Sequence, residues 1–184
     1  MEPWMIVVGV ALIPLIWLIG TYNGLVRLRQ HVTESWSGID TELKRRYDLI
    51  PNLIEVCKGY AKHEKQTFEM VVRARTEAMA EKGGVKDQAR KEDALTRGLG
   101  TMLAVAEDYP DLKASTHFAQ LHDELTNTED RIQASRRFYN ANVRDMNTRC
   151  EAFPSNVIAS MFGFEKVDYF EIQAMERSVP RVDT

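Results

Sequence analysis

Residues 3–26 of the chain contain no Asp, Glu, Lys or Arg, and the first part of this stretch is almost wholly apolar. As a helix, the stretch would extend about 36 Å, which exceeds the roughly 30 Å of hydrocarbon in a bilayer. A cleaved signal peptide is disfavoured, because the chain starts with Met1 and Glu2 and lacks a small-residue cleavage site. A buried core helix is the other alternative. The pattern favours a retained transmembrane anchor over residues 1–26.

Four residues of the predicted membrane span are expected to lie at its interfaces or within it. Trp4 and Tyr22 are 18 positions apart, so a helix places them about 27 Å from each other, near the two interfaces where aromatic rings are enriched. Trp17 lies between them within the span, and Pro14 is tolerated there as a kink.

The flanking charges indicate an orientation for the anchor. No Lys or Arg precedes the apolar stretch, whereas Arg27 and Arg29 follow it directly. Basic residues stay on the cytoplasmic side of a membrane span. The N-terminus is therefore predicted to lie outside and the rest of the chain in the cytoplasm.

Beyond residue 26, apolar residues recur at spacings of three and four, as on one face of a helix. The pattern predicts that the membrane helix continues without interruption to residue 50. Pro51 is expected to force a new start, because proline lacks the backbone N–H that a helix interior uses. The second helix should end near Gly83 and Gly84, which are strong helix stops.

Three further helices complete the predicted fold. They cover residues 87–107, 115–153 and 156–162, the last stopped by Gly163. Gly98 and Gly100 in the first of them indicate close packing against a neighbour. No segment alternates at period two. The fold class is all-α: an elongated antiparallel helical bundle over residues 27–165, continuing from one N-terminal transmembrane helix and followed by an irregular tail over residues 166–184.

Composition and motifs exclude several classes of function. With 24 Lys and Arg against 27 Asp and Glu, the net charge is -3, so nucleic acid is not an expected partner. Cys57 and Cys150 are far apart, which disfavours a disulfide framework and a zinc knuckle. His63 and Glu64 begin like a zinc-protease motif, but Thr67 stands where the second His is needed. No catalytic, cofactor-binding or metal-binding residues are predicted, and no small-molecule substrate is expected.

Several sequence blocks resemble the LemA family, in order and with similar spacing, and together they cover about residues 20 to 165. The blocks are residues 36–40, 43–53, 58–61, 107–114, 128–132, 153–156 and 162–164, with Val56, Arg136, Tyr139, Asn140, Val143 and Asn147. The resemblance implies a single-pass protein of the bacterial inner membrane with an all-helical domain and, for most members, no established biochemical activity. One branch of the family is associated with the formation of the magnetosome membrane.

Polar residues inside these blocks suggest a structural network between helices. An antiparallel bundle would bring the first helix and the last long helix together, and buried polar groups then have to satisfy one another. Solvated charged faces with ordinary pairs along one helix are the alternative. The candidate residues are Asp40, Arg45, Arg46, Asp48, Asn52, Glu129, Arg131, Arg136, Asn140 and Asn147.

Aromatic residues near the tail form a second candidate feature. Phe162, Phe164, Tyr169 and Phe170 are expected to dock onto the bundle, and an oligomer contact is the alternative. The predicted function is a membrane-anchored interaction or scaffold protein that self-associates or holds a membrane-protein partner, without catalytic activity. A membrane-remodelling protein that acts as an oligomer is the alternative, by resemblance to the magnetosome branch.

Overall fold

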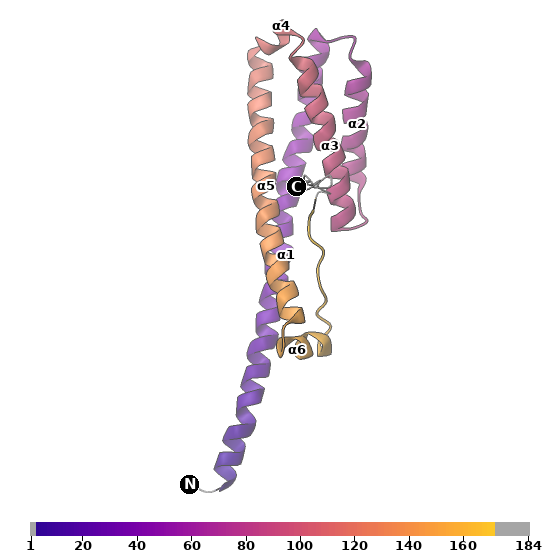
Figure 1. The fold of residues 1–184 in the computed structure, drawn as a ribbon. Helices are drawn as coiled ribbons and strands as arrows, with labels where there is room; N and C mark the ends of the chain where they lie inside the picture. Colours follow the sequence, from indigo (N-terminus) through magenta and orange to yellow (C-terminus); the bar gives the residue numbers. More distant parts are fainter. Residues whose placement is uncertain (1–2, 172–184) are drawn as a thin grey trace, which may run out of the picture. The chain divides into compact units, whose positions relative to one another are not determined.

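The structure of the protein, a computed structural model, describes the backbone of residues 3–171 and the side chains of residues 12–171. Across this part of the chain all regular structure is helical, which confirms the predicted all-α class (Figure 1). The helices are α1 (Pro3–Tyr60), α2 (Lys65–Ala80), α3 (Val85–Ala106), α4 (Pro110–Lys113), α5 (Thr116–Glu151) and α6 (Ser155–Met161).

The chain divides into two compact units, each of which takes part of α1 and part of α5. The first, called here the α6 unit, combines Met1–Asp40 with Ser135–Asp168. The second, called the α2–α3 unit, combines Thr41–Ala134 with Tyr169–Thr184.

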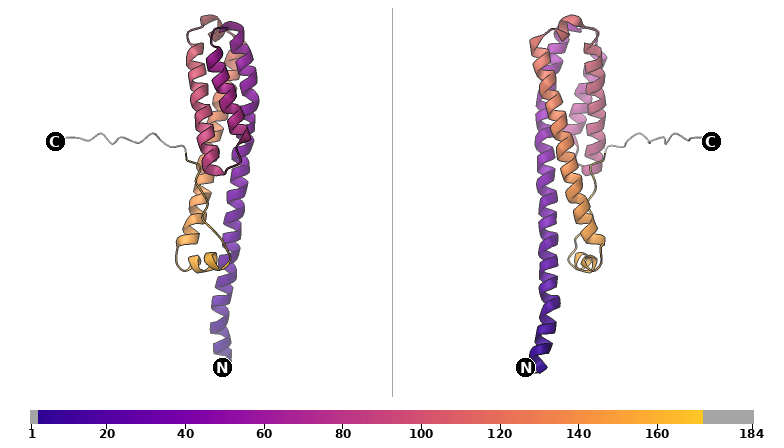
Figure 2. Two further views of the ribbon diagram at one scale, coloured as in Figure 1. Left: turned by 90° about the vertical axis from the view of Figure 1, so that its right-hand side faces the viewer. Right: turned by 60° about the vertical axis from the view of Figure 1, so that its left-hand side comes forward.

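In the α2–α3 unit, α2, α3 and the local parts of α1 and α5 lie side by side, and successive helices are antiparallel (Figures 1 and 2). The apolar stripes face inward, which removes them from water. The core includes Leu43, Ile50, Leu53, Phe68, Val71, Leu95, Leu99, Met102, Leu125 and Ile132.

The two glycines expected to mark close packing on α3 behave differently. Gly98 is buried, and a Cβ added there would lie 3.6 Å from Cγ2 of Val71 on α2. A Cβ added at Gly100 would meet nothing within 4 Å. The prediction is therefore confirmed for Gly98 and wrong for Gly100, which faces away from α2.

The expectation that Pro51 starts a new helix is wrong, because α1 continues through it to Tyr60. Proline at position 51 cannot donate to the carbonyl of Tyr47, one turn earlier. Nε of Arg75 on α2 donates to that carbonyl instead, at 2.7 Å. A side chain from a neighbouring helix thus satisfies the acceptor that proline leaves open, and Pro51 itself is exposed. The break comes later, at residues 61–64.

In the α6 unit, α1 and α5 pack through the predicted period of three and four. Leu25, Val32 and Ile39 of α1 are buried, as are Tyr139, Val143 and Met146 of α5. The rings of Trp36 and Tyr139 meet edge to face, with centroids 5.5 Å apart. The seam predicted on α5 ends before Phe153, which is 85% exposed because α5 stops at Glu151.

The end of α6 confirms that Gly163 stops the helix. Gly163 has φ 68°, a left-handed conformation that favours glycine. The N–H of Phe164 donates to the carbonyl of Ala159 at 2.9 Å, and the N–H of Gly163 donates to that of Ser160 at 3.4 Å. These two bonds form a Schellman motif, which turns the chain away from α6.

Among the residues whose side chains the structure describes, no helix contains a stretch long and apolar enough to cross a membrane. Pro14, Trp17 and Tyr22 of the predicted span lie on α1 within the described residues. The side chain of Trp4 lies outside them.

Candidate functional site: a buried arginine cluster

The most deeply buried charge of the described chain is Arg46, which lies on α1 in the α2–α3 unit and is 1% exposed. It occupies the apolar face of α1, in register with Leu43 and Ile50. Its guanidinium forms an ion pair with Glu92 of α3. Nη1 donates to Oε1 of Glu129 on α5 at 2.6 Å. One cation thus joins three helices.

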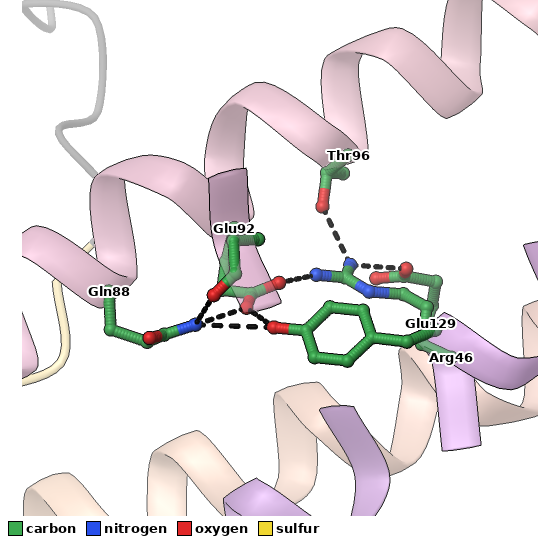
Figure 3. A network of polar contacts seen from close by, with 7 residues as sticks. Arg46, Gln88, Glu92, Thr96 and Glu129 are labelled. Carbon is green, nitrogen blue, oxygen red and sulfur yellow. Dashed lines mark hydrogen bonds and ion pairs between the residues drawn. The ribbon is translucent and has the colours of Figure 1, made fainter. Parts of the chain in front are cut away.

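Neighbouring polar side chains complete the cluster (Figure 3). Nη1 of Arg46 also donates to Oγ1 of Thr96 at 3.0 Å. The second carboxylate oxygen of Glu92 accepts from the hydroxyl of Tyr47 and, at 2.5 Å, from Nε2 of Gln88. Both oxygens of the buried Glu92 therefore have donors, as burial of a charged group requires.

The electrostatics keep the guanidinium of Arg46 and the phenol of Tyr47 protonated. Burial by itself lowers the pKa of Arg46, but the charges of Glu129 and Glu92 outweigh it, so that the pKa is raised and the guanidinium stays charged. Burial, followed by the hydrogen bond to Glu92, raises the pKa of Tyr47 well above its usual range. The phenol therefore remains a donor. Because the charged ends of Arg46 and Glu92 are buried and paired with each other, the arrangement serves structure better than chemistry.

The residues of the predicted polar network differ in burial. Arg46 and Glu129 meet as described. Arg131 is exposed and lies 3.9 Å from Glu42 on α1, at the surface. The other members of the predicted network that lie in the α2–α3 unit are exposed. They are Arg45, Asp48 and Asn52. In the α6 unit, Asp40, Arg136 and Asn140 are half-buried and Asn147 is buried.

The sequence interpretation missed the α3 members of the cluster, Glu92, Thr96 and Gln88. A signal for Glu92 is present in the chain. Glu92 lies three residues after Ala89 and three before Leu95, on the stripe that Leu99 continues. A charged residue at a core position of a helix requires a partner of opposite charge, and Arg46 shows the same pattern on α1.

A second polar contact, in the α6 unit, holds the extended segment that follows α6. Nδ2 of Asn147 donates to the carbonyl of Val167 at 2.9 Å, and the N–H of Val167 donates to Oδ1 of Asn147 at 2.8 Å. The hydroxyl of Tyr139 donates to the carbonyl of Asp168 at 3.0 Å. Side chains of α5 thus satisfy backbone groups that have no strand or helix of their own.

Asn147→Ala is expected to loosen this segment. The substitution removes both hydrogen bonds to Val167, which should cost about 1–3 kcal/mol locally because the backbone groups remain partly buried. Hydrogen exchange at the Val167 amide should accelerate accordingly. Asn127→Ala, at an exposed position of α5, is the matched control and should leave this exchange unchanged. Equal exchange in both variants would contradict the assignment.

The two cysteine thiols have raised pKa values. Burial raises the pKa of the Cys57 thiol to about 11, and burial together with Glu151 raises that of Cys150, so neither thiol is a ready nucleophile. No group of three His, Cys, Asp or Glu suited to a metal occurs within the described residues.

An open groove in the α2–α3 unit, of about 1050 Å³, lies where α1 ends and α2 begins. Its lining is mainly basic, and all of the ionisable side chains in it are exposed. They belong to Lys58, Lys62, His63, Lys65, Glu69 and Arg73. This composition fits an acidic partner rather than a reacting substrate.

These features define an all-helical protein whose buried polar site serves packing. The chain belongs to the LemA family, whose profile it matches over residues 35–183. It is 26% identical to magnetosome protein MamQ 2 of Paramagnetospirillum magneticum over 84% of this chain and 66% of that protein. It is also 26% identical to protein LemA of Metamycoplasma hominis, over 86% of this chain and 73% of that protein. The chain thus spans slightly less than two thirds of its MamQ relative.

Proposed function

We propose that the protein is a membrane-anchored helical interaction protein without catalytic activity. The observation that carries this proposal is the exposure of large apolar side chains on α1. Six of the eight side chains from residue 12 to residue 19 have exposed fractions of 42% to 68%. The residues are Leu12, Ile13, Leu15, Ile16, Trp17 and Ile19.

The distribution of these side chains favours lipid over a single protein partner. At 100° per residue these six side chains spread over an arc of about 200°, and the apolar Pro14 and Leu18 occupy the remaining side of the helix. A surface helix packed on one partner has a single, narrower apolar stripe. They also fall within residues 3–26, which carry no charge. A helix that is apolar all round and about 36 Å long suits a bilayer.

A pair of charges in the apolar stretch is expected to abolish anchoring. Ile13→Arg with Ile16→Arg places two guanidinium groups near the centre of the span, at about 2.5–3.5 kcal/mol each. After alkaline carbonate washing of bacterial membranes, the unaltered full chain should stay in the pellet and the double variant should shift to the supernatant.

Met79→Arg is the control for the anchoring test. It adds a charge at an apolar position of α2 that is 52% exposed, and it should leave the chain in the pellet. Release of the unaltered chain by carbonate would refute the anchor.

The orientation proposed for the anchor follows from Arg27 and Arg29, which come directly after the apolar stretch. They favour an external N-terminus and a cytoplasmic helical domain at the inner membrane. A reporter that is active on one side of the membrane, fused after Thr184, distinguishes the two orientations.

Self-association or a membrane-protein partner is part of the same proposal. The basic groove at the end of α1 supports an interaction role, and neither the family name nor the names of the relatives states an enzymatic activity. Crosslinking in membranes followed by mass photometry in detergent should show an assembly larger than one chain. A strictly monomeric chain without crosslinked partners would argue against this role.

The match to MamQ, named as a magnetosome protein, favours membrane remodelling as a second candidate function. Reconstitution at high density would then change the shape of liposomes. Unchanged liposomes would leave the interaction role as the better explanation.

A further inference from the structure

The short helix α6 presents an apolar face that no part of its own unit covers. Ile158 and Ala159 turn inward and are buried, whereas Val157 and Met161, four residues apart, are 50% and 65% exposed. Phe162, which follows the helix, is 47% exposed. Phe153, which precedes it, is 85% exposed. Four large apolar side chains around one short helix therefore face outward.

The sequence around α6 is also free of charge. Residues 152–164 contain no Asp, Glu, Lys or Arg, in a chain of which 28% is charged. An exposed segment of a soluble surface normally carries charged side chains. The combination of exposure and neutrality indicates that this face meets an apolar medium.

The position of α6 in its unit identifies that medium. α6 lies crosswise to α1 and beside it (Figures 1 and 2). The ring of Phe162 lies 4.9 Å, centroid to centroid, from the ring of Tyr22 on α1. Tyr22 is near the end of the uncharged stretch that we propose enters the bilayer. A helix crosswise to a membrane-spanning helix, at this level, lies in the plane of the membrane surface.

Basic side chains line a depression that begins on α1 within one turn of Tyr22. Arg27 on α1 and Arg149 on α5 line this depression, together with His31 and Asp145. Neither arginine forms an ion pair within the residues described, so both can meet phosphate headgroups. The acidic side chain next to α6 on its N-terminal side, Glu151, pairs with Lys166 at 2.7 Å. Glu165 adds one negative charge at the other end.

We infer that α6 lies in the membrane–water interface, with its exposed face and Phe153 at the boundary between headgroups and acyl chains. This inference rests on the proposed anchor. The occupant of the apolar face is lipid rather than a second copy of the chain, because the face is continuous with the apolar part of α1 through Phe162 and Tyr22. Interfacial helices of this kind insert about 5–10 Å into the boundary.

Depth-dependent fluorescence quenching tests the inference on the full chain in phospholipid vesicles. A fluorophore is attached to one cysteine at a time, in a background that carries Cys57→Ala and Cys150→Ser. The labelled variants are Met161→Cys on α6, Ile16→Cys in the apolar stretch and Met79→Cys on α2, all at exposed positions. The quenchers are spin-labelled phospholipids with the nitroxide at the headgroup, high in the acyl chain or deep in it.

The label at residue 161 should lose most emission to the headgroup and shallow quenchers, at a depth of about 5–10 Å. The label at residue 16 should respond most to the deep quencher, and the label at residue 79 to none. Quenching at residue 16 without quenching at residue 161 would overturn the interfacial position and leave the anchor intact. Quenching at neither residue 16 nor residue 161 would refute both the interfacial position of α6 and the membrane anchor. A label at residue 161 that is shielded from water but not quenched by lipid would show that protein covers α6, which also overturns the inference.

Discussion

Replacing Arg46 with Met is expected to lower the free energy of unfolding by about 3–5 kcal/mol, because the buried carboxylate of Glu92 loses its cation. Methionine retains the length and apolar character of the arginine stem, so little of the loss should come from a cavity. For a chain of this size, the midpoint of thermal unfolding should fall by about 6–20 °C. Circular dichroism of the full chain in detergent micelles measures this shift.

The adjacent residue provides a matched control. Arg45→Met makes the same chemical change at an exposed position of α1, where the effect should stay within about 0.5 kcal/mol. If both variants unfold at the same temperature, the cluster does not stabilise the fold as described.

A double variant separates the cost of an unpaired charge from the value of the pair. Arg46→Met with Glu92→Leu removes both charges, and replacing a buried pair with apolar residues is often neutral or stabilising. The double variant should therefore recover much of the stability that Arg46→Met alone loses. We propose that the pair is kept because it specifies how α1, α3 and α5 pair, which is the use of buried charges that is best attested. Loss of the near-ultraviolet dichroism of the double variant would support that role, and a native spectrum would contradict it.

The helical content was predictable because the apolar period of three and four extends through every long segment. Residues 87–107 and 115–153 correspond closely to α3 (Val85–Ala106) and α5 (Thr116–Glu151). The continuation of α1 through Pro51 could not be predicted from this period. Whether proline ends a helix depends on what satisfies the carbonyl one turn earlier, and here the donor is Arg75, 28 positions away from Tyr47.

The polar cluster was predictable in part for a similar reason. Arg46 and Glu129 stood out because they lie in family-like blocks, but sequence blocks do not show which charged residues face inward. Arg45 and Arg46 are adjacent, and the helix turns them 100° apart, so that one is exposed and the other buried. Placing Glu92 opposite Arg46 requires the register of α3 against α1, which is a property of the packed helices.

The aromatic residues near the tail were expected to dock onto the bundle, with an oligomer contact as the alternative, and the structure places them differently. Phe164 and Phe170 are buried, which agrees with docking, whereas Phe162 is exposed. Phe164 lies under the guanidinium of Arg29, 5.2 Å from its Cζ, and 5.7 Å from the ring of Tyr22. Cation–π and edge-to-face contacts of this kind add to the burial of the ring. Phe164 therefore attaches the segment after α6 to α1.

Phe164→Ala is expected to release this segment, with a local cost of about 3–5 kcal/mol from lost burial and the cavity that remains. Amides of residues 155–171 should then exchange with solvent about 100-fold faster or more, as a locally opened unit does. Phe138→Ala is the matched control, because it removes the same side chain from a position of α5 that is 62% exposed, and should leave exchange in detergent micelles unchanged. Because the two variants differ in burial and not in chemistry, equal protection in both would show that Phe164 does not hold the segment.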